Sequence, residues 1–391
     1  MRSTSPLVVA SLLGAANAGV PKTCSDYRIP ISITSNNAVF GLRPFKSDFD
    51  VAEFVTTIAS HTPEISSSVL SPFTVNATET FTISATFCRP GHEKPDPKRE
   101  NTVLIATHGL NFDRTHPDAD RICVNRYWDP QLDKETYSFV DYVLNEGYSI
   151  FYYDRLGVGE SEQVSGYVAQ LSNQVTILTE LTKLIKGGHY VGGTGRPSKT
   201  VLVGHSFGSA ISSEVVRQNK KLVDGVVLTG FSYNSTHLNG LEFLEAAGVR
   251  IAAQQQPGKW RQLDTGYLTT VDLFASVTTF FHDGYYDTEV ARYVDDHKVP
   301  FAVTELLTGH SFAIQPIDFT GAVMILSGKY DFPFCMSDCD GVLGNPGASI
   351  FSKAKAFKAI SLPGTGHGIN YHTTANQSFE KVTSFLAANG L

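Results

Sequence analysis

The chain has 391 residues, of which 42% are hydrophobic and 18% charged, so its composition excludes a disordered protein and allows one large domain with an insertion. The formal net charge is −7. Because no run of Lys and Arg could follow a phosphate backbone, nucleic acid is not an expected partner.

The first residues are typical of a signal peptide. Arg2 supplies a positive start, Pro6 to Ala16 is small and apolar, and Ala16-Asn17-Ala18 is a small-residue cleavage site. The apolar stretch is shorter than the roughly 20 residues that span a bilayer, and no later segment has the length of a transmembrane helix. We therefore expect residues 1–18 to be a signal peptide and the mature protein to be secreted.

Cysteines and glycosylation motifs fit an extracellular protein. Sequons at Asn76, Asn234 and Asn376 are candidate glycosylation sites. In an oxidising compartment some of the five cysteines should pair and leave one over. Cys335 and Cys339 are close enough to bridge a local loop, whereas the rest of the connectivity stays open. A metal site at this pair is disfavoured, because no second ligand pair has zinc spacing.

The order of the predicted elements indicates an α/β fold. Residues 29–34 and 81–87 have the character of antiparallel strands, and residues 48–60 between them are helix-like. Short apolar runs then alternate with helical segments, which predicts a mostly parallel central sheet with helices on both faces and the ligand site at the carboxyl ends of the strands. The apolar runs are 103–106, 149–153, 200–203, 226–229, 323–326 and 356–360, and two of the helical segments are 138–146 and 170–185.

One interval is too long for a structureless connection between two strands. We interpret residues 235–316 as an inserted cap or lid, with 19–234 and 317–391 as the two parts of the core. Its segment 241–253 looks helical, and the interval is rich in aromatic residues. Most of these aromatics are expected simply to hold the insertion together.

A candidate nucleophile lies after the strand at 200–203. The sequence Gly204-His205-Ser206-Phe207-Gly208 has the form G-x-S-x-G and precedes a helix start of small residues. Alone the pattern is weak, but a strand, a sharp turn and a helix are the setting of a nucleophile elbow, which presents the serine hydroxyl at a helix N-terminus.

A serine needs a base, and the base needs an orienting acid. His367 follows the last predicted strand between small residues, and Asp331 follows the strand at 323–326. Asp338 and Asp340 are nearby competitors that lie further along the chain. The order Ser206, Asp331, His367 is the one expected for this kind of triad, although a surface histidine and a turn-forming aspartate are the alternatives.

Donors for an oxyanion are expected from two backbone N–H groups. One is that of Phe207, and the other is that of Leu110, with Asn111 as second choice, in the loop after the strand that ends near residue 107. A plain strand exit at His108-Gly109 is the alternative. The glycine-rich turn from Asp154 to Ser161 lacks both the dinucleotide spacing and the P-loop lysine, so we interpret it as structural.

Taken together, His108-Gly109, the turn at 154–161, Gly204-x-Ser206-x-Gly208, Asp331 and Gly366-His367 resemble the ordered landmarks of the α/β-hydrolase superfamily over residues 100–391. The resemblance implies a Ser-Asp-His triad with no metal and no organic cofactor. The turn at 154–161 is similar to that of the epoxide-hydrolase and haloalkane-dehalogenase branch. That branch carries Asp at the elbow where this chain has Ser206, which favours ester cleavage.

Three functions stay open at this point. The leading hypothesis is a secreted serine hydrolase acting on a carboxylic ester or lactone of an apolar small molecule. The second is a tailoring enzyme of the same fold that performs acyl transfer, lactonisation or cyclisation, since one fold hosts many reactions. The third is a non-catalytic binding protein, which would have no need of all three triad groups.

Overall fold

The computed structural model describes residues 22–59, 70–91, 99, 101–117, 123–125, 127–234, 242–309 and 315–391. The expected signal peptide therefore lies outside the described residues.

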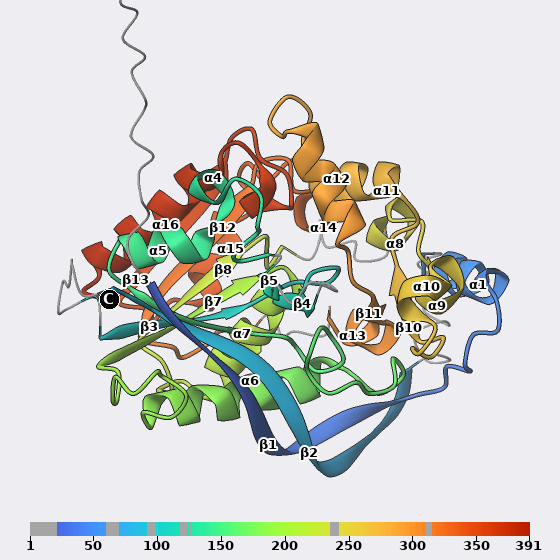
Figure 1. Ribbon diagram of the computed structural model, residues 1–391, viewed down its shortest axis with the longest axis horizontal. Helices are drawn as coiled ribbons and strands as arrows, with labels where there is room; N and C mark the ends of the chain where they lie inside the picture. Colours follow the sequence, from blue (N-terminus) through green and yellow to red (C-terminus); the bar gives the residue numbers. More distant parts are fainter. Residues whose placement is uncertain are drawn as a thin grey trace, which may run out of the picture.

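An eight-stranded sheet runs through the centre of the molecule in the order β1-β2-β6-β3-β7-β8-β12-β13 (Figure 1). The pairs β1–β2 and β2–β6 are antiparallel, and every neighbouring pair from β6 to β13 is parallel. The predicted α/β fold with a mostly parallel sheet is thus confirmed. The strands are β1 (Lys22–Phe40), β2 (Leu70–Pro90), β3 (Thr102–Thr107), β6 (Ser149–Tyr153), β7 (Lys199–His205), β8 (Gly225–Thr229), β12 (Ala322–Gly328) and β13 (Ala356–Leu362).

Helices cover both faces of the sheet. Successive residues of a strand point to opposite faces, so a strand in which every residue is apolar needs a cover on each side. Leu104 and Ala106 of β3 pack in one core with helices α5 and α16, whereas Val103 and Ile105 pack in a second core with α6 and α7. In the described part of the chain, no helix is both long and apolar enough to cross a membrane. The helices of the core are α4 (Lys134–Tyr137), α5 (Phe139–Asn145), α6 (Leu171–Lys186), α7 (Phe207–Gln218), α14 (Phe332–Cys335), α15 (Gly344–Ile350), the 3-10 turn η1 (Ile369–Tyr371) and α16 (Ala375–Ala388), whereas α1 (Asp48–Ala59) packs against residues 242–251 (Figure 1).

The two antiparallel strands are much longer than the predicted segments. They form a ribbon that extends along one side of the molecule (Figure 1). Ile29, Ile31 and Ile33 of β1 are buried and alternate with exposed residues, so a single face of the ribbon packs on the core. The ends of both strands, beyond the predicted segments, are largely polar, so the sequence pattern does not mark them as strand.

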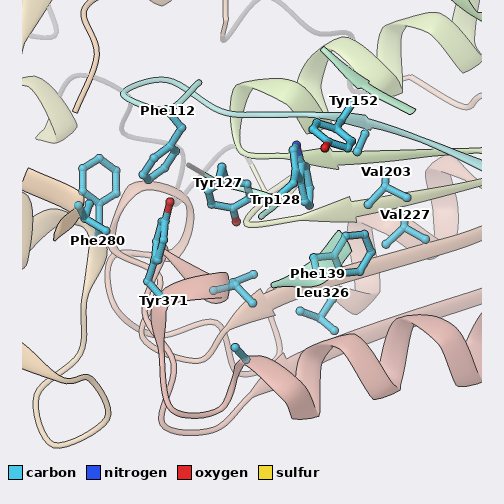
Figure 2. Packing of buried hydrophobic residues seen from close by; sticks show 14 of the residues in the cluster. Phe112, Tyr127, Trp128, Phe139, Tyr152, Val203, Val227, Phe280, Leu326 and Tyr371 are labelled. Atoms are coloured by element: carbon cyan, nitrogen blue, oxygen red, sulfur yellow. The ribbon is translucent and has the colours of Figure 1, made fainter. Parts of the chain in front are cut away.

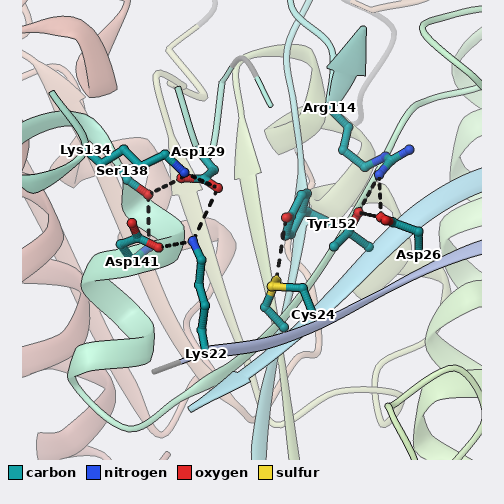
Figure 3. The surroundings of a disulfide bond; sticks show 11 residues. Lys22, Cys24, Asp26, Arg114, Asp129, Lys134, Ser138, Asp141 and Tyr152 are labelled. Atoms are coloured by element: carbon teal, nitrogen blue, oxygen red, sulfur yellow. Dashed lines mark hydrogen bonds and ion pairs between the residues drawn. A yellow bond between two sulfur atoms is a disulfide. The ribbon is translucent and has the colours of Figure 1, made fainter. Parts of the chain in front are cut away.

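Disulfides join Cys24 to Cys88 and Cys335 to Cys339. The first connects residues that face each other in the register of β1 and β2, a pairing that the sequence had left open. Figure 3 shows how the start of β1 is also held by charge, since Lys22 forms ion pairs with Asp129 and Asp141.

Between β8 and β12 the chain forms a separate small unit with a three-stranded sheet in the order β11-β10-β9. The helix predicted over 241–253 is interrupted at residues 247–251, because Gly248 has a positive φ of 51° and ends α8, after which the chain pairs as β9 before α9 begins at Ala252. The elements are α8 (Glu242–Ala246), β9 (Arg250–Ile251), α9 (Ala252–Gln255), α10 (Pro257–Trp260), β10 (Tyr267–Thr269), α11 (Leu273–Phe280), α12 (Thr288–Asp296), β11 (Phe301–Ala302) and α13 (Val303–Thr308), and the two-stranded β4 (Thr115–Pro117) and β5 (Cys123–Asn125) precede β6.

The two disulfides should differ in their contribution to stability. The Cys24–Cys88 bridge spans 64 residues and the Cys335–Cys339 bridge only 4. On the loop-entropy model, replacing both cysteines by serine should lower the free energy of unfolding by about 4 kcal/mol for the first bridge and about 2 kcal/mol for the second. Urea unfolding of the two double variants measures the difference, and equal losses would contradict it.

Candidate active site

Ser206 occupies a sharp turn between β7 and α7. Its backbone has φ 54° and ψ −121°, a region that a residue with a side chain rarely adopts. Such a conformation costs about 1–3 kcal/mol and persists only where its surroundings enforce it. The N–H of Ser206 donates to the carbonyl of Thr229 at 2.9 Å, which fixes the turn against β8. The expected elbow geometry is therefore present at the predicted serine.

Glycines allow the elbow to pack against the neighbouring strand. A Cβ added to Gly208 would lie 2.1 Å from the carbonyl oxygen of Thr107, at the end of β3. A Cβ on Gly109 would lie 2.8 Å from the Cβ of Ser206. Both approaches are too close for any side chain, so the loop after β3 and the start of α7 meet at Ser206.

The structure brings His367 and Asp331 together. The Nδ1 atom of His367 lies 2.8 Å from Oδ2 of Asp331, and both side chains are buried. The other carboxylate oxygen of Asp331 accepts from the N–H of Phe334 at 3.0 Å and caps α14. Asp340, one of the competitors, is exposed and paired with Lys329, so it does not take this place.

Aromatic rings surround the His367 imidazole. Phe280 stacks on one side at 5.9 Å between ring centroids, and Phe334 stacks at 5.7 Å. The ring of His205 lies 4.9 Å away and is itself stacked on Tyr127 at 4.3 Å. Burial lowers the pKa of His205 well below its usual value, so this neighbour of His367 is neutral.

Figure 2 shows the cluster of aromatic rings beside His205. Phe112 contacts Tyr127 at 4.8 Å, Tyr371 at 5.7 Å and Phe280 at 5.4 Å, and Trp128 packs edge-on against Tyr127. Rings from the core and from the 242–309 unit thus form one packed group, which leaves little freedom for the imidazoles beside it.

His372 holds the loop that carries His367. Its Nε2 accepts hydrogen bonds from the backbone N–H of Gly366 at 3.0 Å and of His282 at 3.1 Å, so its Nδ1 carries the proton and donates to the carbonyl of Gly368 at 2.9 Å. The loop is therefore fixed on both sides of His367. Burial lowers the pKa of His372 to about 4, which keeps this arrangement neutral.

A pocket opens beside Ser206 and His367 and is lined mainly by apolar side chains. Ser206 and His367 lie on its wall together with Leu110 and Phe207, the residues expected to supply oxyanion donors, and its cavity volume is about 40 Å³. Asn111, the second choice, does not line it. The remaining lining residues are Ala210, Phe243, Phe280, Glu305, Leu306, Gly309, Pro333 and Phe334.

Several pocket residues were not identified from the sequence. Glu305 lies in α13, is buried, and forms an ion pair with the equally buried Arg155. Burial raises the pKa of Glu305, while the Arg155 charge acts in the opposite direction. The turn that contains Arg155 could be recognised in the sequence. Nothing in the sequence around Glu305 indicates that it pairs with Arg155.

The Asp154 side chain holds the turn from Asp154 to Ser161 in place. Asp154 is buried and accepts from the backbone N–H of Arg114 at 2.6 Å and of Glu160 at 3.0 Å. A Cβ on Gly159 would lie 2.4 Å from the Asp154 carboxyl carbon, so the carboxylate fills the space that a phosphate loop leaves open. Among the described residues, no group of three or more His, Cys, Asp or Glu side chains could hold a metal ion.

The neutral state of His372 predicts a pH dependence of stability. Its folded pKa of about 4 lies below the usual 6.5, so the unfolded chain binds a proton that the folded chain does not as the pH falls from 6.5 to 4. Folding should lose roughly 3 kcal/mol from this group over that window, and His372→Gln should remove the loss because glutamine does not titrate. Urea unfolding at pH 7, 5.5 and 4 compares the two proteins, and parallel curves would refute the assignment.

Comparison with known proteins agrees with the architecture. Residues 135–262 match a family model described as Hydrolase_4, serine aminopeptidase S33, while no curated protein matches the chain. A thermophilic esterase from Thermogutta terrifontis has a TM-score of 0.50 at 15% identity, over 79% of this chain and 95% of that one.

Two further solved structures cover similar shares of the chain. An α/β-hydrolase fold protein from Chitinophaga pinensis has a TM-score of 0.47 at 13% identity over 77% of this chain and 94% of that one. MenH from S. aureus has a TM-score of 0.48 at 16% identity over 78% and 99%. The sheet order and the elbow are those of the α/β-hydrolase fold, and residues 135–262 are similar to a family of serine hydrolases.

Proposed function

We propose that the protein is a serine hydrolase that cleaves a carboxylic ester or lactone of an apolar small molecule through an acyl-enzyme. The observation that carries the proposal is the contact between His367 and Asp331, with Ser206 on its strained turn at the wall of the same pocket. A nucleophile, a base and an orienting acid in one place are the requirements for acyl transfer.

The expected reaction follows from which ring nitrogen is free. Because Nδ1 of His367 is bound to Asp331, Nε2 is the atom that takes the proton of Ser206 as its oxygen attacks the ester carbonyl. The oxyanion that forms would be stabilised by the N–H groups of Phe207 and Leu110. The same imidazole then returns the proton to the leaving alcohol, and water repeats the sequence to release the acid.

The pocket supports an apolar and small acyl group. A cavity of about 40 Å³ holds only about three water-sized groups, at roughly 10–15 Å³ each. A short acyl chain therefore fits without rearrangement of the walls. Its contacts would be with side chains such as Phe243, Leu306 and Pro333.

An ester fits this pocket better than an amino-terminal peptide bond. A free amino terminus is a cation, and its burial in an apolar pocket is costly unless it is paired with a carboxylate. Among the described residues that line the pocket, the carboxylate is that of Glu305, and Arg155 already neutralises it. A tailoring role stays the second candidate, because an alcohol that replaced water would accept the same acyl group.

We further propose that residues 235–316 act as a lid, that residues 1–18 direct secretion, and that Asn76 carries a glycan. Phe243, Phe280 and Glu305 of the proposed lid lie on the pocket wall, which supports the first part. Asn76 is exposed on β2. Asn376 is a weaker candidate for a glycan than Asn76, because its amide group donates to the carbonyl of Glu135 at 3.0 Å and is partly buried.

The triad predicts that the three groups act as one unit. Ser206→Ala should lower kcat for a short-chain p-nitrophenyl ester by at least about 10⁴-fold, and adding His367→Ala should reduce it little further. Asp331→Asn should keep the fold but lower kcat by about 10⁴-fold, because the amide favours the wrong imidazole tautomer. Steady-state kinetics and mass spectrometry of the trapped acyl-enzyme provide the measurements.

A phosphonate probe supplies the control for these variants. It should label Ser206 in the unaltered protein and nothing in a correctly folded Ser206→Ala variant. Full activity of that variant on esters would end the nucleophile assignment. Product analysis with water and an alcohol competing for the acyl group separates hydrolysis from transfer.

Processing provides an independent prediction. Expressed in a secretory host, the protein recovered from the medium should begin near Gly19, and an Asn76→Gln variant should migrate faster by the mass of one glycan. Amino-terminal sequencing and glycosidase treatment give the readouts. Recovery of an intact Met1 from the medium would contradict the signal peptide.

A further inference from the structure

In the peptide that joins Gly109 to Leu110, two side chains contact the carbonyl oxygen of Gly109. Nη2 of Arg155 donates to this oxygen at 3.3 Å, and Nδ1 of His108 lies 2.9 Å from it. The backbone N–H of Arg155 donates to Nε2 of His108 at 3.2 Å. Because Nε2 must then be unprotonated, the His108 proton is on Nδ1 and points at the Gly109 carbonyl.

A carbonyl held in this way also fixes the N–H of the same peptide. In a planar trans peptide the C=O and the following N–H point in opposite directions. The carbonyl of Gly109 faces Arg155, so the N–H of Leu110 faces away from it, and Leu110 lies on the pocket wall beside Ser206. A guanidinium on the carbonyl also polarises the peptide, which makes its N–H a stronger donor.

Two further contacts hold the Arg155 side chain in place. Its Nη1 pairs with Glu305, whose same oxygen accepts from Gln174 at 2.8 Å. Its guanidinium lies 5.0 Å from the ring centroid of Phe207, the residue that carries the other expected oxyanion donor. The side chains of Arg155 and Glu305 are 0% and 1% exposed, so the pair acts without screening by solvent.

We propose that Arg155 is the positioning residue of the oxyanion hole: its guanidinium, held by Glu305 of α13, orients and polarises the Gly109–Leu110 peptide toward the carbonyl oxygen of the substrate. The proposal rests on the proposed acyl-transfer function. Arg155 touches no reacting atom, so its effect should appear in the stabilisation of the tetrahedral species and not in the binding of the ester.

A trifluoromethyl ketone with a short alkyl chain tests the proposal. The oxygen of Ser206 adds to the ketone carbon, its proton passes to His367, and the former carbonyl oxygen becomes an oxyanion in the hole. The variant Arg155→Met with Glu305→Gln removes the guanidinium without leaving a buried unpaired charge. We expect kcat to fall and the inhibition constant of the ketone to rise, each by about 10²-fold, with KM within about threefold of the original value.

A matched control removes an ion pair that does not contact the Gly109 peptide. Arg217 and Glu214 pair on α7, and their change to Met and Gln should leave kcat, KM and ketone inhibition unchanged. A folded Arg155→Met/Glu305→Gln protein with unaltered kcat and ketone inhibition would overturn the proposal, as would a fall in kcat that ketone inhibition does not follow.

A second variant keeps the test decisive if the double variant does not fold. Lysine has one ammonium group and cannot bind Glu305 and the Gly109 carbonyl as the forked guanidinium does, so Arg155→Lys should weaken ketone inhibition by about tenfold. Ketone inhibition by Arg155→Lys equal to that of the unaltered protein would overturn the proposal. If the unaltered protein does not bind the ketone through Ser206, the proposed function fails instead.

Discussion

Helix α7 begins against the carboxyl end of β3, and the other parts of the site depend on this contact. Gly208 and Gly109 make the approach possible, because a Cβ on either would lie under 3 Å from Thr107 or Ser206. The contact brings the loop after one parallel strand to Ser206, which follows the neighbouring strand. It also helps to hold Ser206 at a positive φ that an isolated turn would release.

The 242–309 unit is tied to both sides of this contact. On the side of the base, the carbonyl of Phe280 accepts from Gly368 at 2.7 Å, and the N–H of His282 donates to His372. On the other side, Glu305 pairs with Arg155 beside the Gly109 carbonyl. The unit therefore supports the candidate site as well as lining it, since the His367 loop and the loop after β3 each have a contact that the core strands alone do not provide.

The sequence predicted those parts of the structure that are determined by residues close together in the chain. Buried parallel strands and the glycines around Ser206 have signals within a few residues, so the sheet, Ser206 and the position of His367 after the last strand could be anticipated. The supports could not, because they join distant segments: Arg155 and Glu305 are 150 residues apart in sequence. The helix predicted over 241–253 failed for a related reason, because pairing with β10 draws the chain after Gly248 into a strand.

The buried ion pair restricts how a substrate could enter. Moving the whole 242–309 unit away from the core would separate Glu305 from Arg155, and breaking a buried pair by removing one partner typically costs about 3–5 kcal/mol. The α13 segment should therefore stay on the core during turnover. Phe243 of α8 and Phe280 of α11 line the pocket and pack against each other, and Phe280 contacts the core through the rings of Phe112 and His367 and one backbone hydrogen bond from Gly368. Such contacts can repack at lower cost, so opening is expected at α8 and α11, while the oxyanion loop keeps its geometry throughout.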